Sequence, residues 1–116
     1  MKTREIAHDE WSEFFDRVSG SLQGKQIVIE VDYPDLGAQI EVSKLSLNGL
    51  SYDRKGDAFI ISTEVIEHLI HQPRKIFVSG DEDGFDGLEI TTDGGGAHII
   101  GFSEPLALPL MPATPA

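Results

Sequence analysis

A helical repeat of apolar residues lies near the start of the chain. Four residues fall on one stripe of an α-helix, namely Trp11, Phe14, Phe15 and Val18. Asp9 is a candidate N-cap for this helix, and Gly20 is well placed to end it. Three aromatic rings on one stripe bury a large apolar area, which favours a place in the core over a ligand pocket. The pattern therefore predicts an N-terminal helix packed on the rest of the domain.

Alternating apolar and polar residues dominate the chain after this helix, and they predict strands. Seven segments alternate in this way or form short apolar runs between turns: 26–33, 39–43, 50–53, 58–62, 75–79, 87–92 and 97–103. Turn-forming residues separate them, among them Asn48 with Gly49, and the hairpin sequence 54–57. No strand–helix–strand unit repeats, which disfavours a nucleotide-binding α/β sheet. The predicted fold is α+β, with the helix packed on a twisted, mostly antiparallel sheet of six or seven strands, and a barrel-like curl is one form this sheet could take.

Segment 64–72 fits two structures. Its apolar residues repeat at helical spacing: Val65, Ile66, Leu69 and Ile70. Thr63 can cap such a helix, and Pro73 would end it at about the preceding residue. A strand is the alternative, because the periodicity of short apolar runs is weak. We expect a short second helix here.

The end of the chain differs in composition from the rest. Segment 105–116 holds four of the six prolines, so we predict an extended Pro-rich tail on a single domain that spans 1–104. Its apolar side chains, including Leu106 and Met111, could dock in an apolar groove on the same domain or on a second copy. The resulting hypothesis is a homodimer supported by the tail.

Composition and charge narrow the class of protein. The chain has 116 residues, the size of one domain, and it contains no Cys, which excludes disulfides and thiolate chemistry. The formal net charge is −11, and no Lys or Arg follows Lys75. Such a field repels nucleic acid and anionic membranes. No signal sequence or apolar run of spanning length is present, so a cytoplasmic protein is expected, with no nucleic acid and no membrane among its partners.

An acidic loop is the first candidate for site chemistry. Asp81, Asp83 and Asp86 lie in a segment with Gly84 and Gly87, and hard cations such as calcium bind several carboxylates on flexible loops. The EF-hand pattern is not met, because the twelfth position from Asp81 is Thr92 instead of Glu. An acidic hairpin loop explains the same residues through their turn preference. These three carboxylates are therefore only weak metal candidates.

Two further motifs have structural explanations. His68 and His71 would share one face of a helix, but two imidazoles are too few for a zinc site. Gly94 to Gly96 lead into a predicted strand, whereas phosphate-binding loops lead into a helix. Motifs of serine hydrolases and P-loop enzymes are lacking from the sequence. No catalytic residue, cofactor-binding residue or cofactor is predicted.

A set of short motifs resembles a known family. The motifs are Thr3–Ile6, Glu10-Trp11 with Phe14-Phe15, Asp35–Gln39, Gly49–Asp53, and His68–Ile70 with Pro73-Arg74. Together they resemble a family of small bacterial cytosolic proteins that is known only as a domain of unknown function. The resemblance extends to about Leu108 and implies a single-domain protein, and it implies nothing about activity.

Three classes of function remain open. The favoured one is a non-enzymatic interaction or accessory module with an unknown protein partner, because no reactive constellation stands out. The alternatives are a small-ligand protein or enzyme with an unrecognised pocket, and a cation-binding module that uses loop 81–87. A deep pocket with perturbed carboxylates or histidines would favour an enzyme, and an exposed apolar patch would favour the interaction module.

Overall fold

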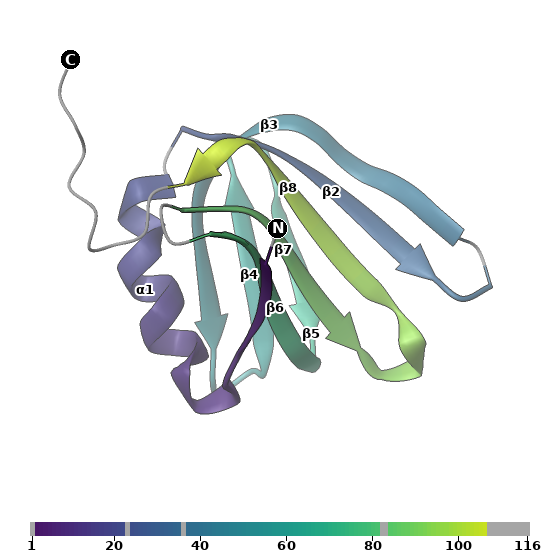
Figure 1. Cartoon of the computed structure of the whole chain (residues 1–116). Coiled ribbons are helices and arrows are strands. Elements are labelled where there is room, and N and C mark those ends of the chain that lie inside the picture. The colour runs from purple at the N-terminus through teal and green to yellow at the C-terminus, as the bar shows by residue number, and fades with distance from the viewer. Residues whose placement is uncertain (1, 23, 36, 82–83, 107–116) are drawn as a thin grey trace, which may run out of the picture.

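The computed structural model describes residues 2–22, 24–35, 37–81 and 84–106. Its elements in chain order are β1 (Lys2–Ile6), the 3₁₀ turn η1 (His8–Glu10), α1 (Trp11–Leu22), β2 (Gln26–Tyr33), β3 (Gly37–Asp53), β4 (Ala58–Thr63), β5 (Glu67–His71), β6 (Pro73–Asp81), β7 (Gly84–Thr92), the 3₁₀ turn η2 (Asp93–Gly95) and β8 (Ala97–Leu106) (Figure 1). The strands form one antiparallel sheet in the order β1-β6-β7-β8-β2-β3-β4-β5. The predicted α+β class is confirmed.

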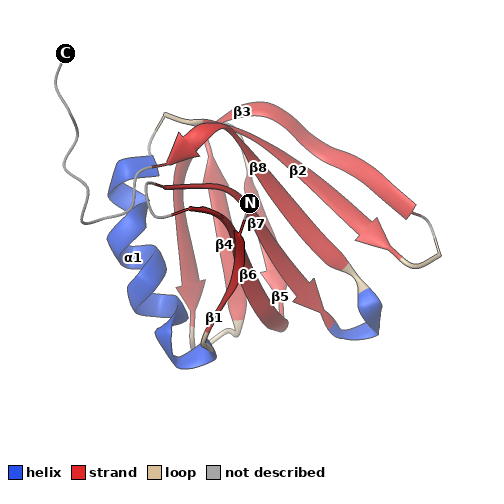
Figure 2. Cartoon of the chain, in the orientation of Figure 1, coloured by secondary structure: helices blue, strands red, loops and turns tan. Residues whose placement is uncertain are grey.

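The number of strands and the second helix were predicted wrongly. The sheet has eight strands, because β1 and β5 were missed and two predicted strands, 39–43 and 50–53, belong to the single strand β3. Within the described residues, α1 is the only α-helix (Figure 2). The sheet does not close into a barrel, since β1 and β5 remain as its two edges.

The long strand β3 folds the sheet into two layers. Its first half pairs with β2 and its second half pairs with β4. Lys44 lies in the β2-paired half, at the register shift between Leu45 and Ser43, and has a left-handed backbone with φ of 58°. We call β1, β6, β7, β8, β2 and the first half of β3 the first layer, and the rest of β3 with β4 and β5 the second layer. The core lies between these layers and under α1.

The turn predicted at Asn48 and Gly49 is instead a bulge within β3. The pairing with β4 shifts register between Leu47 and Gly49. A Cβ at Gly49 would lie 2.6 Å from Ser19 Oγ, so glycine lets α1 approach the strand closely. The backbone N–H of Leu50 donates to the same Ser19 oxygen at 3.1 Å. Helix packing, rather than chain reversal, therefore accounts for the glycine.

The apolar stripe of α1 is buried as predicted. Trp11 is 1% exposed, and the other three residues of the stripe are also buried. The Trp11 indole N–H donates to the Ile6 carbonyl at 2.9 Å, which ties the helix to the end of β1. The predicted helix ends were wrong: Asp9 lies in η1, where no side chain caps the turn, and Gly20 lies inside the helix. Gly24, with φ of 88°, follows the helix instead.

The segment 64–72 forms a turn followed by the edge strand β5, which spans Glu67–His71, instead of a helix. Thr63 does cap a structure, but that structure is a tight turn: its hydroxyl accepts from the Ile66 N–H at 3.0 Å and donates to the Ile66 carbonyl at 2.8 Å. Pairing with β4 then continues from Glu67 to His71. Only Ile70 among the apolar residues of this segment is buried. The helical spacing was coincidental, because most of these residues do not face the core.

The remaining hairpins agree with the sequence pattern. Residues 54–57 close the β3–β4 hairpin, and η2 joins β7 to β8 with left-handed Gly94 and Gly95. Pro105 and Leu106 form the end of β8, whereas 107–116 lie outside the described residues, as does the predicted docking of the tail. Across the described ranges, no helix has the length and apolar character needed to span a membrane.

Candidate functional site

The corner between β5 and β6 lies next to two hollows in the surface of the protein. Gln72 is the single residue between these strands, and its backbone is left-handed, with φ of 53°. Its N–H donates to the Asp57 carbonyl at 2.7 Å, which holds the corner against the β3–β4 hairpin. The chain passes here from the second layer to the first. Two hollows share Gln72 and Asp93, one on each side of the corner.

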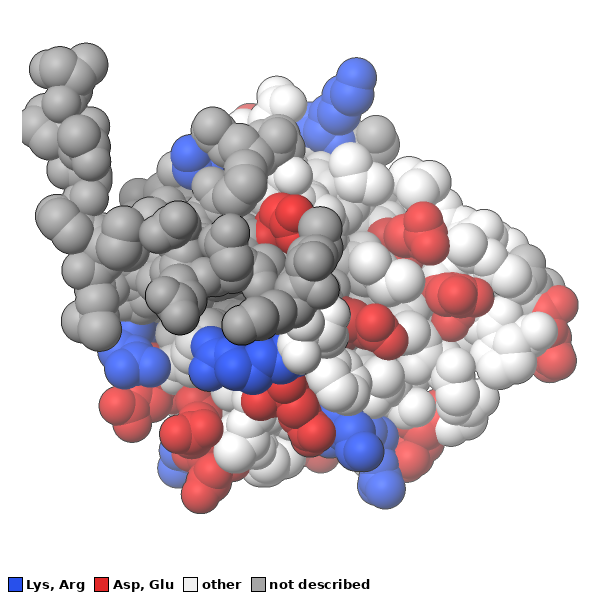
Figure 3. Space-filling model, in the orientation of Figure 1, with Lys and Arg blue, Asp and Glu red and all other residues white. Residues whose placement is uncertain are grey.

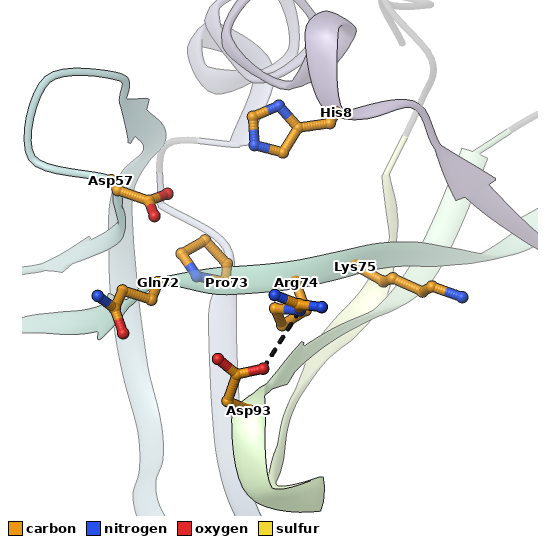
Figure 4. A pocket seen from close by; sticks show the side chains of 7 residues that line it. All are labelled: His8, Asp57, Gln72, Pro73, Arg74, Lys75 and Asp93. Atoms are coloured by element: carbon orange, nitrogen blue, oxygen red, sulfur yellow. Dashed lines mark ion pairs between the residues drawn. The ribbon is translucent and has the colours of Figure 1, made fainter.

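The first hollow, which we call the polar pocket, has a volume of about 440 Å³. Its lining residues are His8, Asp57, Gln72, Pro73, Arg74, Lys75 and Asp93 (Figure 4). Arg74 Nε lies 3.3 Å from Asp93 Oδ1, but these side chains are 64% and 72% exposed. An ion pair this exposed contributes at most about 1 kcal/mol. The charges of the pocket are therefore largely solvated, and two acids balance two bases.

A buried tyrosine lies beside the polar pocket. The Tyr52 hydroxyl donates to Asp57 Oδ1 at 2.7 Å, and its ring packs edge-on against Trp11 at a centroid distance of 5.0 Å. Burial, followed by the hydrogen bond and the charge of Asp57, raises the pKa of Tyr52 to about 12. Tyr52 therefore stays protonated at neutral pH and cannot serve as a base there. It supports Asp57 and the packing under η1.

The polar pocket offers little for catalysis. Its lining contains no Ser, Thr or Cys, and its partly buried carboxylate, Asp57, is already bonded to Tyr52. His8 is exposed and stacks at 4.1 Å on the Trp11 ring. A general base needs a partner that orients it and a proton within reach. What this arrangement can do is hold a small polar molecule weakly.

The second hollow runs beside β5, and we call it the β5 groove. It has a volume of about 350 Å³ and is lined by Tyr33, Leu69, Ile70, His71, Gln72, Thr92, Asp93 and His98. One wall is β5 itself, and the other comes from the ends of β2, β7 and β8. The first layer therefore faces β5 across the groove at this corner. In Figure 1 the ends of β2, β7 and β8 that line the groove lie on the side of the molecule that carries the β2–β3 hairpin.

The backbone of β5 has a free hydrogen-bonding edge. The Thr63 N–H donates to the Ile66 carbonyl, and the Gln72 N–H donates to the Asp57 carbonyl. Antiparallel pairs alternate between bonded and non-bonded, so every second residue between these two pairs faces β4. The backbone groups of Glu67, Leu69 and His71 then point away from β4. Over the described ranges, no strand pairs with β5 on this side.

Exposed apolar side chains lie at the same edge. Val65 is 68% exposed, Ile66 44% and Leu69 46%; we call these three residues the β5 patch. Tyr33, in the groove wall, is 43% exposed. The turn before β5 is held by Thr63, so Val65 and Ile66 are presented on a bonded turn. Four of the five large apolar residues that are exposed among the described ones thus belong to the β5 patch or the groove.

The two histidines that were weighed as a metal pair, His68 and His71, do not lie together. In strand β5, His68 and His71 are three residues apart and therefore point to opposite faces. His68 faces inward instead, with Nε2 at 3.1 Å from Nδ1 of His98, which is 8% exposed. His98 was not among the candidate residues, although it lies two residues before the buried Ile100 in β8 and therefore faces the same side of the sheet. Within the described part of the chain, no three His, Cys, Asp or Glu residues group as metal ligands.

The acidic loop cannot be assembled into a site from the described residues. Asp83 lies outside them, and so does the side chain of Asp81, whose backbone pairs with Gly84 at the end of β6. Asp86 is half-buried in β7. The described residues on either side of 82–83 pair as a β-hairpin, with Asp81 opposite Gly84, which agrees with the expected hairpin at this position.

The fold and surface of the described residues together define a class: one α-helix packed on a folded antiparallel sheet whose edge strand β5 lies beside a groove. The chain belongs to a family of unknown function, DUF5335, whose model matches residues 2–111. An uncharacterised protein of Aquifex aeolicus is 33% identical over 110 residues, which cover 94% of this chain and 99% of that protein. No solved structure matches the chain. The resemblance seen in the sequence is confirmed, and no function is assigned to the family.

Proposed function

We propose that this protein is a non-enzymatic interaction module that binds a segment of another protein at β5. The observation that carries the proposal is the coincidence, on one short strand, of a free backbone edge and exposed apolar side chains. Addition of a strand to an exposed sheet edge is a recurrent mode of peptide recognition, in which backbone hydrogen bonds supply affinity and side-chain pockets supply specificity.

An unprotected edge strand exposes a protein to unwanted pairing with other chains. Natural sheets blunt their edges with charges, prolines, bulges or covering segments, because an open edge pairs with other chains. Glu67 is the only acidic or basic residue of β5 apart from its two histidines, and Leu69 stands at the middle of the strand. The pairing of β4 with β5 has no register shift. A flat, partly apolar edge of this kind supports a docking role.

The β5 groove adds the second element of such a site. A strand placed beside β5 would direct alternate side chains into a hollow of about 350 Å³. Tyr33 and His98 lie in its wall, so an incoming side chain would meet an aromatic ring and an imidazole. By contrast, the polar pocket has solvated charges and a carboxylate that is already bonded. Binding at β5 therefore accounts for more of the unusual surface than ligand binding in the polar pocket does.

A selection from a displayed peptide library tests this proposal. The library is selected on the wild-type protein, and each enriched peptide is measured against Leu69→Lys and against Thr3→Lys, the same change at an exposed position of β1. We expect Leu69→Lys to weaken binding at least about tenfold, which corresponds to about 1.4 kcal/mol, and Thr3→Lys to leave it unchanged. Peptides that bind all three proteins equally, or a library without any enriched peptide, would contradict the proposal. Melting temperatures of both variants confirm that they are folded.

A further inference from the structure

The shape of the β5 groove indicates what kind of chain can occupy it. Tyr33, Thr92 and His98 face β5 across the groove from the ends of three first-layer strands, so the first layer forms a wall next to the free edge. A strand bound to β5 would lie beside this wall. Two copies paired through their β5 strands would each bring a first layer into the same space, because antiparallel pairing keeps the faces of both sheets on the same side. A single extended segment avoids this conflict.

Side chains of such a segment would alternate between two environments. One set would face the groove, next to the inward row of β5 that contains His68 and Ile70, and would meet Tyr33 and His98. The other set would face outward, in line with Glu67, Leu69 and His71. The hollow and the exposed Leu69 both favour apolar side chains. The segment should therefore be apolar at every groove position and opposite Leu69.

The charge of the surrounding surface indicates which side chain the segment should carry opposite Glu67. Glu64 and Glu67 are both exposed at the patch, and the stretch 63–72 contains no Lys or Arg. Asp93, at the end of the groove, is the acid already paired with Arg74. In Figure 3 further acidic side chains lie along the side of the molecule where the β2–β3 and β7–β8 hairpins end. With a net charge of −11, the whole protein also attracts cationic chains.

From these three observations we infer that β5 takes an extended basic–apolar segment of a partner protein, with a Lys or Arg opposite Glu67 and an apolar residue opposite Leu69. This inference rests on the function proposed above and names the chemistry of the partner. Cross-strand pairs of opposite charge and of apolar residues each stabilise a sheet modestly. The pattern thus sets specificity, while the backbone bonds align the segment.

Two synthetic heptapeptides with blocked ends test the inference. The basic peptide is Thr-Lys-Val-Val-Val-Lys-Thr, which reads the same in both directions, and the acidic peptide carries Glu in place of each Lys. In titrations of the labelled full chain followed by NMR, we expect the basic peptide to bind at least about fivefold more tightly, with shifts at Leu69, Ile70 and Tyr33. Raised salt should reduce this difference. Glu67→Lys should reverse the preference between the peptides, and it keeps the exposed position polar.

Four results would overturn the inference. They are equal binding of both peptides, a preference for the acidic one, no binding of either peptide at millimolar concentration, and a dimer in light scattering that Leu69→Lys converts to a monomer. Failure of the inference can be separated from failure of the proposed function through the library selection. If the enriched segments are acidic or neutral and their binding depends on Leu69, the inference of a basic partner is wrong but the proposed interaction module stands. If no segment of any composition binds β5, both are wrong.

Discussion

The two edge strands of the sheet have the same length and different protection. β1 presents exposed Thr3, Arg4 and Glu5, and its last residue accepts the indole hydrogen bond of Trp11. β5 presents exposed Leu69 between Glu67 and His71, next to the apolar turn with Val65 and Ile66. Charged residues make β1 a poor template for another strand, whereas β5 lacks that protection. This difference is the basis of our proposal that a partner docks at the β5 end of the sheet.

The surroundings of the two edges reinforce this contrast. Near β1, the rings of His8, Trp11 and Tyr52 pack together, and Tyr52 is bonded to Asp57. Beside β5, the neighbouring first layer leaves a groove of about 350 Å³. At the first end, aromatic rings pack together beside the polar pocket, whose charged lining is solvated. At the second end, the groove lies next to unpaired backbone and exposed apolar side chains.

The largest effect is expected from Trp11→Ala at the β1 end. The substitution removes a buried indole and its bond to the Ile6 carbonyl, and a change of this kind costs about 3–5 kcal/mol. Denaturant melts would measure the loss. The matched change at the other edge, Leu69→Ala, should cost less than about 1 kcal/mol because that side chain is half exposed. A loss below about 1 kcal/mol for Trp11→Ala would show that the β1 end is not anchored as described.

An alkaline effect is expected from Tyr52. The unfolded chain releases this phenolic proton near pH 10, whereas the folded protein holds it until about pH 12. The contribution of Tyr52 to the free energy of unfolding is therefore complete below pH 10 and is lost as pH rises through 12. At pH 11.5 the lost part should be about 2 kcal/mol.

Urea melts of the wild type and Tyr52→Phe at pH 8 and pH 11.5 isolate this contribution. The advantage of the wild type should shrink by about 2 kcal/mol between the two pH values, because the two proteins differ only in the Tyr52 hydroxyl. An unchanged difference between the two proteins would mean that Tyr52 ionises as freely in the folded protein as in the unfolded chain.

A smaller effect on stability is expected at β5. Leu69→Lys should change the free energy of unfolding by less than about 0.5 kcal/mol, because the side chain is half exposed and none of the described strands pairs with β5 on the side of its backbone groups. Its neighbour Ile70 is 1% exposed, and Ile70→Ala should cost about 2–4 kcal/mol. Both follow from the alternation along one strand. Similar losses for the two variants in chemical denaturation would mean that the outer side of β5 is covered.

No measurable effect is expected from calcium. The β6–β7 hairpin lies at neither edge of the sheet, and its sequence lacks the ligand set of an EF-hand. The melting temperature should be the same in millimolar calcium and in chelator. A rise of several degrees that chelator reverses would show a cation site in this hairpin.

The wrong prediction for β5 shows which strands can be predicted from the sequence and which cannot. Strands β2, β4 and β8 were predicted because one face of each is buried, so their alternation reflects the core. Along β5 the exposed residues are apolar as well, and the sequence contains no sign of which face meets the core. The spacing of the apolar residues Val65, Ile66 and Leu69 therefore matched the apolar stripe of a helix. The residues that misled the prediction are those that we assign to docking.

The rest of the candidate site depends on contacts that are distant in sequence. His98 meets His68 across the two layers, and Tyr33 meets Leu69 across the groove. β1 escaped prediction because its single buried residue, Ile6, gives no alternation to detect. Sequence patterns of this kind report local periodicity, whereas these neighbours are set by the bend in β3 that brings the layers together.

Residue-resolved amide hydrogen exchange, with and without a peptide from the library selection, tests the central claim most directly. The account predicts that bound peptide slows exchange of the Leu69 and His71 amides at least about tenfold, because they gain partners. The amides of Thr3 and Arg4 in β1 should exchange as before, and so should those of His68 and Ile70, which already face β4. Protection at β1, or its absence along β5 under saturating peptide, would contradict the assignment of β5 as the docking edge.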